Sequence, residues 1–136
     1  MIYVFVADGS ESVREALREL IAEMDGVELA GMARDASGAI SGYLKQARKR
    51  VPPQVLILDI QLDDGSGLGV LKFIRNRFSA TKIIALCDCG SVVYQERCIS
   101  QGADYFFDKT TEFHRVQDVL CGLTRVGDFP NFGVAA

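Results

Sequence analysis

Three charged residues stand where short apolar runs end, and their types could together do phosphoryl or metal-ion chemistry. Asp8 and Asp59 each close a run of four apolar residues, and Lys109 follows a run rich in aromatic residues. Two neighbouring carboxylates repel each other, so together they form a favourable binding site for a hard cation such as Mg²⁺. A carboxylate can also act as a nucleophile and form an aspartyl phosphate, while an ammonium group neutralises a phosphoryl oxygen. These chemistries require a fold that brings the three side chains together.

The elements that must position these residues alternate between short apolar runs and helical periods. Nearly continuous apolar runs are typical of strands buried on both faces of a parallel sheet. The ligand crevice of such a sheet lies at the carboxyl ends of its strands, where Asp8, Asp59 and Lys109 stand. Ser10 or Ser12 can cap the first helix. The predicted strands span 2–7, 27–32, 55–58, 82–86 and 104–107, and the predicted helices span about 13–24, 36–49, 68–78, 91–100 and 113–123.

Five strands alternating with five helices predict an α/β fold, a flavodoxin-like (βα)5 doubly wound parallel sheet with strand order 2-1-3-4-5. In this order the first and third strands are neighbours. We therefore expect Asp8 and Asp59 to lie side by side, with Lys109 two strands further along. A length of 136 residues fits one domain, which we place at residues 1–124, with a tail or the start of a linker at 125–136.

Composition excludes several classes of function. The net charge of −3 provides no basic footprint for nucleic acid or an anionic membrane surface. No apolar run approaches the roughly 18 residues of a membrane span, and no basic segment followed by an apolar one begins the chain. We expect a cytoplasmic protein that binds neither nucleic acid nor membrane directly. The charged residues of the first helix indicate a solvated face, and the basic cluster at 45–50 indicates a solvated helix end.

The cysteines favour packing over metal or disulfide chemistry. The sequence has no C-x-x-C pattern, and its single histidine, His114, has no metal-ligand spacing to a cysteine. Reduced thiols commonly pack as small apolar side chains. We therefore expect buried or half-buried thiols at all four positions. These are Cys87, Cys89, Cys98 and Cys121.

Three segments resemble the receiver domain of bacterial two-component response regulators. Residues 55–62 followed by 65–68 are similar to the phosphoacceptor segment of that family. Residues 4–8 followed by 13–15 resemble its first strand and helix, and residues 102–109 resemble its fifth strand. The resemblance extends to about Leu123, and three segments in order at matching separations make it specific.

The resemblance implies a role for each site residue. Asp59 would accept a phosphoryl group from the phosphohistidine of a sensor histidine kinase or a phosphotransfer protein. Asp8, Asp59 and the backbone carbonyl of Gln61 would hold Mg²⁺, and Lys109 and Cys87 would bind phosphoryl oxygens. The family's switch positions correspond to Phe106 and Cys87, and the positions that tune dephosphorylation correspond to Gln61 and Cys89.

The implied output is a change of surface and not enzymatic turnover. Added charge at Asp59 would draw Lys109 and the loop after the fourth strand inward and bias a two-state surface. The expected surface combines segments 91–100, 104–107 and 113–123, to which a downstream protein or a second copy would bind. An effector domain removed after the tail is the alternative output. No acid/base pair beyond the phosphotransfer site indicates an enzyme.

Four positions depart from the family pattern. Gly9 stands where the family has a second acid, the more direct metal ligand, and Cys87 stands where it has Thr or Ser. Asp63 and Thr110 replace prolines in the loops. A hydrogen bond to a charged group contributes roughly 1.5–3 kcal/mol, and a thiol is a weak donor in that place. Glu11 and Asp63 are the acids that could replace the missing metal ligand.

Other interpretations remain open at this point. A pseudo-receiver that binds a protein partner without phosphorylation is the second hypothesis, and Gly9 and Cys87 favour it. A flavodoxin-like FMN-binding domain is disfavoured, because the acidic loop 8–12 has too few glycines and hydroxyls to wrap a phosphate. Taken singly, each charged residue could be a strand end meeting solvent. Phe106 and Cys87 could be ordinary core residues.

Overall fold

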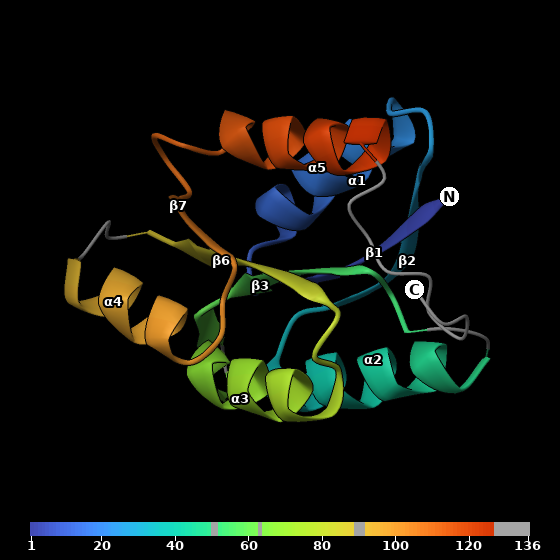
Figure 1. Ribbon diagram of the computed structural model, residues 1–136. Coiled ribbons are helices and arrows are strands. Elements are labelled where there is room, and N and C mark those ends of the chain that lie inside the picture. Colours follow the sequence, from blue (N-terminus) through green and yellow to red (C-terminus); the bar gives the residue numbers. More distant parts are fainter. Residues whose placement is uncertain (50–51, 63, 89–91, 127–136) are drawn as a thin grey trace.

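The centre of the molecule is a five-stranded parallel sheet (Figure 1). The computed structural model describes residues 1–49, 52–62, 64–88 and 92–126. The strands are β1 (Ile2–Ala7), β2 (Val27–Ala33), β3 (Val55–Asp59), β6 (Lys82–Cys87) and β7 (Tyr105–Asp108). They lie in the order β2-β1-β3-β6-β7. This order is the predicted 2-1-3-4-5 when only the strands of this sheet are counted, so the flavodoxin-like α/β fold is confirmed.

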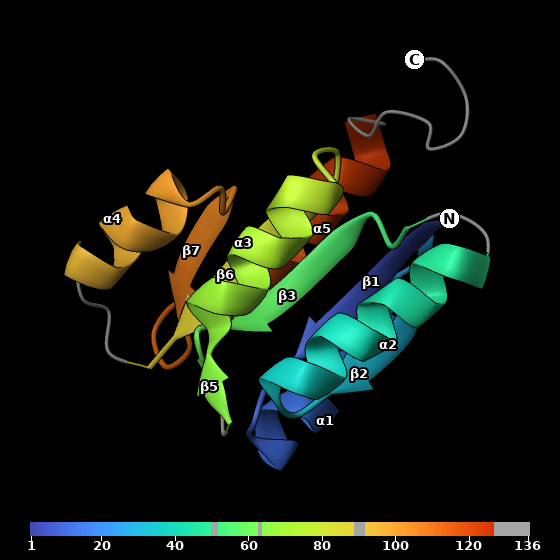
Figure 2. The ribbon, with the colours of Figure 1, turned by 90° about the horizontal axis from the view of Figure 1, so that it is seen from below.

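Five helices cover the two faces of the sheet. They are α1 (Glu11–Ala22), α2 (Ala36–Lys49), α3 (Gly67–Arg77), α4 (Val92–Ser100) and α5 (His114–Val126). Figures 1 and 2 show α1 and α5 on one side of the sheet, and α2, α3 and α4 on the other. Helices on both faces are expected because a parallel sheet buries both of its faces.

Each face of the sheet builds its own apolar cluster, because successive side chains of a strand point to opposite faces. The cluster under α1 and α5 includes Val6, Ile57, Leu86, Leu17 and Leu120. The cluster under α2, α3 and α4 includes Ala7, Leu58, Ala85, Tyr43 and Ile74. All of these side chains are almost completely buried.

The same alternation decides where the charged residues point. Ala7 and Leu58 belong to the cluster under α2 and α3, so Asp8 and Asp59, one residue later, point toward the α1 and α5 side. Phe107 belongs to the cluster under α1 and α5, so Lys109, two residues later, points to that side as well. The alternation of side chains along the strands therefore directs all three charged side chains to the α1 and α5 side, at the carboxyl ends of the strands.

The segment after Asp59 differs from the prediction of a loop at residues 65–67. Two short strands, β4 (Gln61–Leu62) and β5 (Gly65–Ser66), pair antiparallel there as a separate small sheet, and Gly67 already begins α3. The donation from Gly67 N to Ile60 O, at 2.9 Å, closes this hairpin. A strand of two residues is too short to show a period in the sequence, which is why the pattern does not reveal it.

The remaining differences concern the ends of elements. Bounds differ from the predicted ones by at most three residues, as expected because helix and strand ends are the least determined part of a pattern. The last helix continues to Val126, beyond the predicted end at residue 123. No disulfide joins the three described cysteines, of which Cys87 and Cys98 are buried and Cys121 is half-buried.

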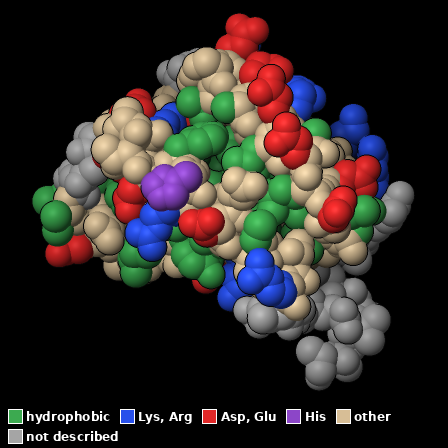
Figure 3. All heavy atoms as spheres, turned by 90° about the horizontal axis from the view of Figure 1, so that it is seen from above, with side chains coloured by type: hydrophobic (Ala, Val, Ile, Leu, Met, Phe, Trp, Pro, Cys, Tyr) green, Lys and Arg blue, Asp and Glu red, His purple; other side chains and the backbone are tan. Residues whose placement is uncertain are grey.

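On the outer surface above α1 and α5, acidic and basic side chains are interspersed with hydrophobic ones (Figure 3). Four glutamates of this surface follow one another every fourth residue along and just after α1, and all are exposed. The pair of Arg18 Nε and Glu15 Oε1, at 3.4 Å, links neighbouring turns. These features fit the predicted solvated helix face. The four glutamates are Glu11, Glu15, Glu19 and Glu23.

Candidate functional site

The carboxyl edge of the sheet brings the three predicted charged residues into contact. Lys109 Nζ lies 2.8 Å from Asp8 Oδ2 and 3.0 Å from Asp59 Oδ2. The side chains of Asp8, Asp59 and Lys109 are 0%, 6% and 7% exposed, so both ion pairs are nearly shielded from water. Because β1 and β3 are direct neighbours, their terminal carboxylates lie side by side. Lys109 reaches both from the far side of β6.

The beginning of α1 holds Asp8 in place. Ser10 N donates to Asp8 Oδ1 at 2.8 Å, and Ser10 Oγ accepts from Val13 N at 3.3 Å as the cap of the helix. Arg14 Nη1 donates to the backbone carbonyl of Asp8 at 2.8 Å. The sequence places Arg14 only on a solvated helix face, so this contact is a finding of the structure. The only hint of this contact in the sequence is that Arg14 lies one helical turn after the capping residue Ser10.

The strand end at Asp59 continues directly into the β4–β5 hairpin. Gln61 N donates to Asp59 Oδ1 at 2.9 Å. The Ile60–Gly67 pair is hydrogen-bonded, so the next pair in the ladder, Gln61 with Ser66, is a non-hydrogen-bonded pair. The N–H and C=O of Gln61 therefore both face away from Ser66, on the side where its N–H reaches the Asp59 carboxylate.

The loop after β7 fixes the backbone of Lys109. Lys109 N donates to the carbonyl of Cys87 at 2.9 Å. Asp108 Oδ1 accepts from Thr110 N, Thr110 Oγ1 and Thr111 N at 2.8, 2.6 and 3.2 Å. These hydrogen bonds lower the pKa of Asp108, the largest contribution being that of the Thr110 hydroxyl. Asp108, which the sequence did not single out, thus holds together the turn that follows Lys109.

The electrostatics of the site combine burial with opposite charges. Burial raises the pKa of Asp8 above its ordinary 3.8, since it penalises the charged form more than Lys109 and Ser10 favour it. Burial by itself would lower the pKa of Lys109, but the carboxylates of Asp8 and Asp59 together raise it above 10.5. The two ion pairs of Lys109 therefore stabilise the fold below pH 10.5. This contribution to the free energy of unfolding is lost as the pH rises through the raised pKa of Lys109.

The donor set at this edge fits a hard divalent cation. Besides Lys109, no donor among the described residues reaches Asp8 Oδ2, which is fully buried. That oxygen, Asp59 Oδ2 and the outward-facing carbonyl of Gln61 are all oxygen donors, the kind that Mg²⁺ prefers. Within the described part of the chain, no cluster of three or more His, Cys, Asp or Glu side chains could hold a metal. The site therefore offers two carboxylates and a carbonyl.

The remaining predicted site residues are Cys87, Phe106, Glu11, Cys89 and Asp63. Cys87 is the last residue of β6 and follows Leu86, which pairs with Asp59 of β3. The side chain of Cys87 is fully buried in the cluster under α2, α3 and α4. Phe106 is half-buried and packs against the same cluster. Glu11 is exposed at the beginning of α1. Cys89 and Asp63 lie outside the described residues.

Gly67 is a site residue that the sequence shows only as part of a loop. A Cβ at this position would lie 2.3 Å from the carbonyl oxygen of Asp59 and 2.5 Å from Ile60 Cα. Both are backbone atoms, so neither can rotate away. The close approach of Gly67 lets the hairpin close directly over the end of β3.

Substitution of Gly67 by alanine is expected to destabilise the protein by about 1–3 kcal/mol, because the backbone around Asp59 must shift. Gly69, in the first turn of α3, provides the matched control, because a methyl group at this position would have nothing within 4 Å. Gly69→Ala should be neutral or stabilise by up to about 1 kcal/mol, since alanine favours helix. Urea unfolding of both variants measures the contrast, and equal stability of the two would contradict this account of Gly67.

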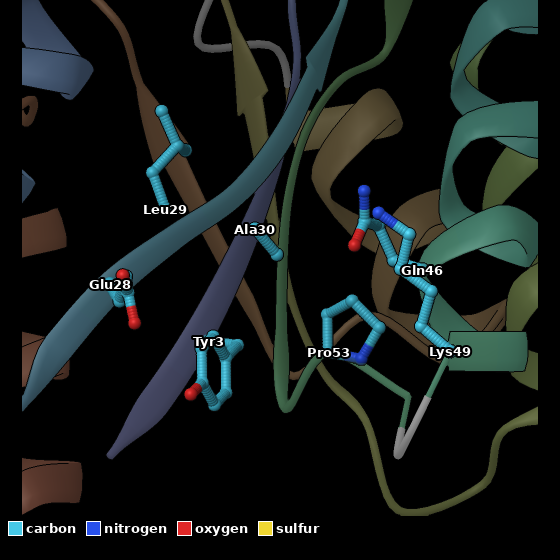
Figure 4. A pocket seen from close by; sticks show the side chains of 7 residues that line it. All are labelled: Tyr3, Glu28, Leu29, Ala30, Gln46, Lys49 and Pro53. Carbon is cyan, nitrogen blue, oxygen red and sulfur yellow. The ribbon is translucent and has the colours of Figure 1, made fainter.

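Two of the hollows that described residues line lie beside strand β2. One, of about 240 Å³, is lined by Tyr3, Glu28, Gln46, Lys49 and Pro53 together with Leu29 and Ala30 (Figure 4). These residues lie where β1 and β2 begin and α2 ends, at the edge opposite Asp8 and Asp59. This hollow therefore does not belong to the charged site. The other hollow lies beside Asp8.

Comparison with known proteins identifies the family. A sequence profile of the response regulator receiver domain matches residues 4–120. The chain belongs to the receiver domain family of response regulators. The resemblance of the three segments to that family is thereby confirmed, and the match includes Asp8, Asp59 and Lys109.

Two relatives show how much of longer proteins this receiver domain represents. The protein-glutamate methylesterase/protein-glutamine glutaminase 5 of Myxococcus xanthus is 30% identical over 89 residues, which are 65% of this chain and 24% of that protein. The acid tolerance regulatory protein ActR of Rhizobium meliloti is 30% identical over 97 residues, 71% of this chain and 48% of that protein. The chain thus spans half or less of these relatives.

Solved structures agree on the fold of the receiver domain. The response regulator domain of CheB from Thermotoga maritima is 23% identical, with a TM-score of 0.75 over 92% of this chain and 94% of that one. The phosphorylated cyanobacterial phytochrome response regulator RcpA is 15% identical, with a TM-score of 0.76 over 98% of this chain and 99% of that one.

None of the helices in the described part of this chain could cross a membrane.

Proposed function

We propose that this receiver domain accepts a phosphoryl group on Asp59 from the phosphohistidine of a sensor histidine kinase or a phosphotransfer protein. The contact of one buried ammonium with two buried carboxylates at the carboxyl edge of the sheet carries the proposal. An Asp59 carboxylate oxygen attacks phosphorus as the bond to the imidazole nitrogen breaks. The products are an acyl phosphate and a histidine that keeps the electron pair of the broken bond.

Lys109 supplies the fixed positive charge for this transfer. Its ammonium lies 3.0 Å from Asp59 Oδ2, so a positive charge is already next to the carboxylate that would receive the phosphoryl group. The backbone contact of Lys109 N with the Cys87 carbonyl and the turn held by Asp108 keep it there. We assign Cys87 a further phosphoryl contact through its thiol. Gln61 and Cys89 are assigned the tuning of dephosphorylation.

Mg²⁺ is the cofactor that the donor set would hold. Asp8, Asp59 and the carbonyl of Gln61 are its proposed ligands, and the ion would neutralise charge on the phosphoryl oxygens. The buried Asp8 Oδ2, which has only the Lys109 ammonium as a partner among the described residues, supports this assignment. Gly9 removes one carboxylate from the set, so we expect weaker Mg²⁺ binding than a three-acid site provides.

The proposed output surface combines α4, β7 and α5. Val92, Val93 and Ile99 of α4 are large apolar side chains that are 66%, 66% and 46% exposed. Phe106 of β7 is half-buried and packs against the cluster under α2, α3 and α4, and we assign it the role of a switch residue. We propose that a downstream protein or a second copy binds here when Asp59 is phosphorylated. The receiver unit is assigned to residues 1–124 and the tail or linker start to 125–136.

Intact mass spectrometry after incubation with a small acyl phosphate and Mg²⁺ tests the proposal. The wild-type protein should gain one phosphoryl group, and Asp59→Asn should gain none. Asp118→Asn, which removes an exposed carboxylate of α5, is the matched control and should gain the group. A gain that persists in Asp59→Asn would overturn the assignment of the phosphoacceptor.

A pseudo-receiver that binds its partner without phosphorylation is the second candidate function. Gly9 at the second acid position and the burial of Cys87 in an apolar cluster favour it. It predicts no mass gain from either the small donor or a phosphorylated histidine protein. It also predicts equal partner binding by the wild-type protein and Asp59→Asn, whereas the first candidate predicts a difference.

A further inference from the structure

A second charged region adjoins the phosphorylation site on the side away from Asp59. It is a hollow of about 350 Å³ at the carboxyl end of β2, lined by Arg14, Met32, Ala33, Arg34, Asp35 and Gly38. Figure 2 shows the beginnings of α1 and α2 at this same end of the sheet. We call it the Arg14–Arg34 hollow. The function proposed above uses none of the side chains that line it.

The two guanidinium groups of the Arg14–Arg34 hollow retain most of their donors. Arg14 donates from Nη1 to the carbonyl of Asp8, and no contact with another described residue uses its remaining N–H groups. Arg34 is exposed, and within the described part of the chain no hydrogen bond, ion pair or ring contact engages it. Guanidinium groups carry a positive charge, so the hollow presents two of them.

The acidic groups next to the hollow are occupied by the backbone of α2. Asp35 Oδ1 accepts from Gly38 N at 2.7 Å and from the Ser37 hydroxyl at 3.4 Å. Asp64 accepts from Ala36 N at 2.5 Å and from Ser37 N at 3.3 Å, and the Ala36 contact contributes most to lowering its pKa. These carboxylates satisfy amides of the helix beginning, so they do not pair with either arginine.

We propose that the Arg14–Arg34 hollow binds the phosphate group of a small anionic metabolite. Guanidinium groups match phosphate oxygens with two parallel N–H donors, and a pair of them provides several charge-assisted hydrogen bonds. A volume of about 350 Å³ leaves room at the surface for a phosphate and a small organic group. Because Arg14 also donates to the backbone carbonyl of Asp8, the bound phosphate contacts a residue that holds the backbone of the neighbouring site.

Amide NMR titrations of the Asp59→Asn protein without Mg²⁺ test this proposal. Under these conditions no phosphoryl transfer occurs, so the result does not depend on the proposed function. The probes are inorganic phosphate, adenosine monophosphate and glutarate, each at constant ionic strength. We expect saturable shifts from both phosphates at residues 32–38 and at Arg14 and Asp8, with weaker shifts from glutarate.

Substitutions identify the arginine contribution. Arg34→Ala should weaken phosphate binding at least about tenfold, because a hydrogen bond to a charged group is lost, and Arg34→Lys should recover part of it. Arg48→Ala removes an exposed arginine at the far end of α2 and should leave the affinity unchanged. Arg34 is exposed, so its loss leaves the fold intact, as a dispersed spectrum verifies.

Three outcomes would overturn the proposal. Shifts that do not saturate show non-specific association of the anions without a binding site. An equal weakening by Arg34→Ala and Arg48→Ala shows attraction to net charge without a site. Stronger binding of glutarate than of either phosphate assigns the hollow to the carboxylate of an acidic partner and removes phosphate as its ligand.

Discussion

Replacing Lys109 by methionine is expected to lower the free energy of unfolding by about 3–5 kcal/mol at neutral pH. Methionine preserves the approximate length of the side chain but leaves Asp8 and Asp59 buried, 0% and 6% exposed, without a cation. Removing one partner of a buried ion pair costs this much because the remaining charge is neither hydrated nor neutralised. Urea unfolding in a metal-free buffer measures the change.

The loss in the Lys109→Met protein should shrink as the pH falls. Burial raises the pKa of Asp8 above 3.8 in the native protein, and removal of the ammonium takes away a contact that lowers it. An acid with a higher pKa in the folded than in the unfolded state is protonated first in the folded state. The stability of the variant therefore rises as the pH falls through that raised pKa toward 3.8. A deficit that stays constant down to about pH 4 would contradict the explanation.

Two further proteins separate charge from packing at Lys109. Asp8→Asn combined with Lys109→Met removes one of the two buried carboxylate charges that are left without a cation. The double variant should therefore recover a large part of the lost stability. Lys72→Met, at an exposed position of α3, is the matched control and should change stability by no more than about 0.5 kcal/mol. If the double variant were as unstable as Lys109→Met, lost packing of the lysine stem would be the cause.

Replacing Gly9 by aspartate is expected to tighten Mg²⁺ binding by at least about tenfold, the factor associated with even indirect partners of a metal site. The new carboxylate would follow Asp8 directly and add a third negative charge around the cation. The positive-φ glycines of the described chain are Gly26 and Gly102, so Gly9 has a backbone that aspartate can adopt. Calorimetric titration of Mg²⁺ into both proteins measures the effect.

The matched control for this change is Gly9→Asn, which has the same shape as Gly9→Asp without the charge. It should leave the Mg²⁺ affinity within about threefold of the wild-type protein, because an amide oxygen is a weaker ligand than a carboxylate for this ion. Glu11→Gln tests whether Glu11 already replaces the missing acid. Unchanged affinity in Gly9→Asp, with Glu11→Gln equally unchanged, would show that the acids at this edge do not determine Mg²⁺ binding.

Much of the fold could be predicted because the pattern of the strands is strong. The runs that end at Asp8 and Asp59 are continuous and apolar, and the helices between strands repeat with the helical period. Five such pairs leave few allowed topologies, and the observed order β2-β1-β3-β6-β7 is the expected one. The β4–β5 hairpin was missed, because a strand of two residues has no measurable period.

In the candidate site, only the residues that stand at strand ends could be predicted from the sequence. Asp8, Asp59 and Lys109 each follow a recognisable run, and the carboxyl ends of parallel strands share an edge. The supporting residues have no such marker. Arg14 resembles any exposed helix charge, and Gly67 resembles any loop glycine. Asp108 precedes Lys109, but its role depends on the turn that Thr110 and Thr111 make.

The sequence by itself determined the sheet, the order of its strands and the edge at which two acids and a lysine meet. These follow from local periodicity and from general rules of chain connection. Only the tertiary structure decided that Lys109 contacts both Asp8 and Asp59 and that Arg14 holds the Asp8 carbonyl. It also decided that Gly67 lies against the backbone of Asp59. Such contacts depend on distances of a few ångströms set by packing, which no pattern along the chain encodes.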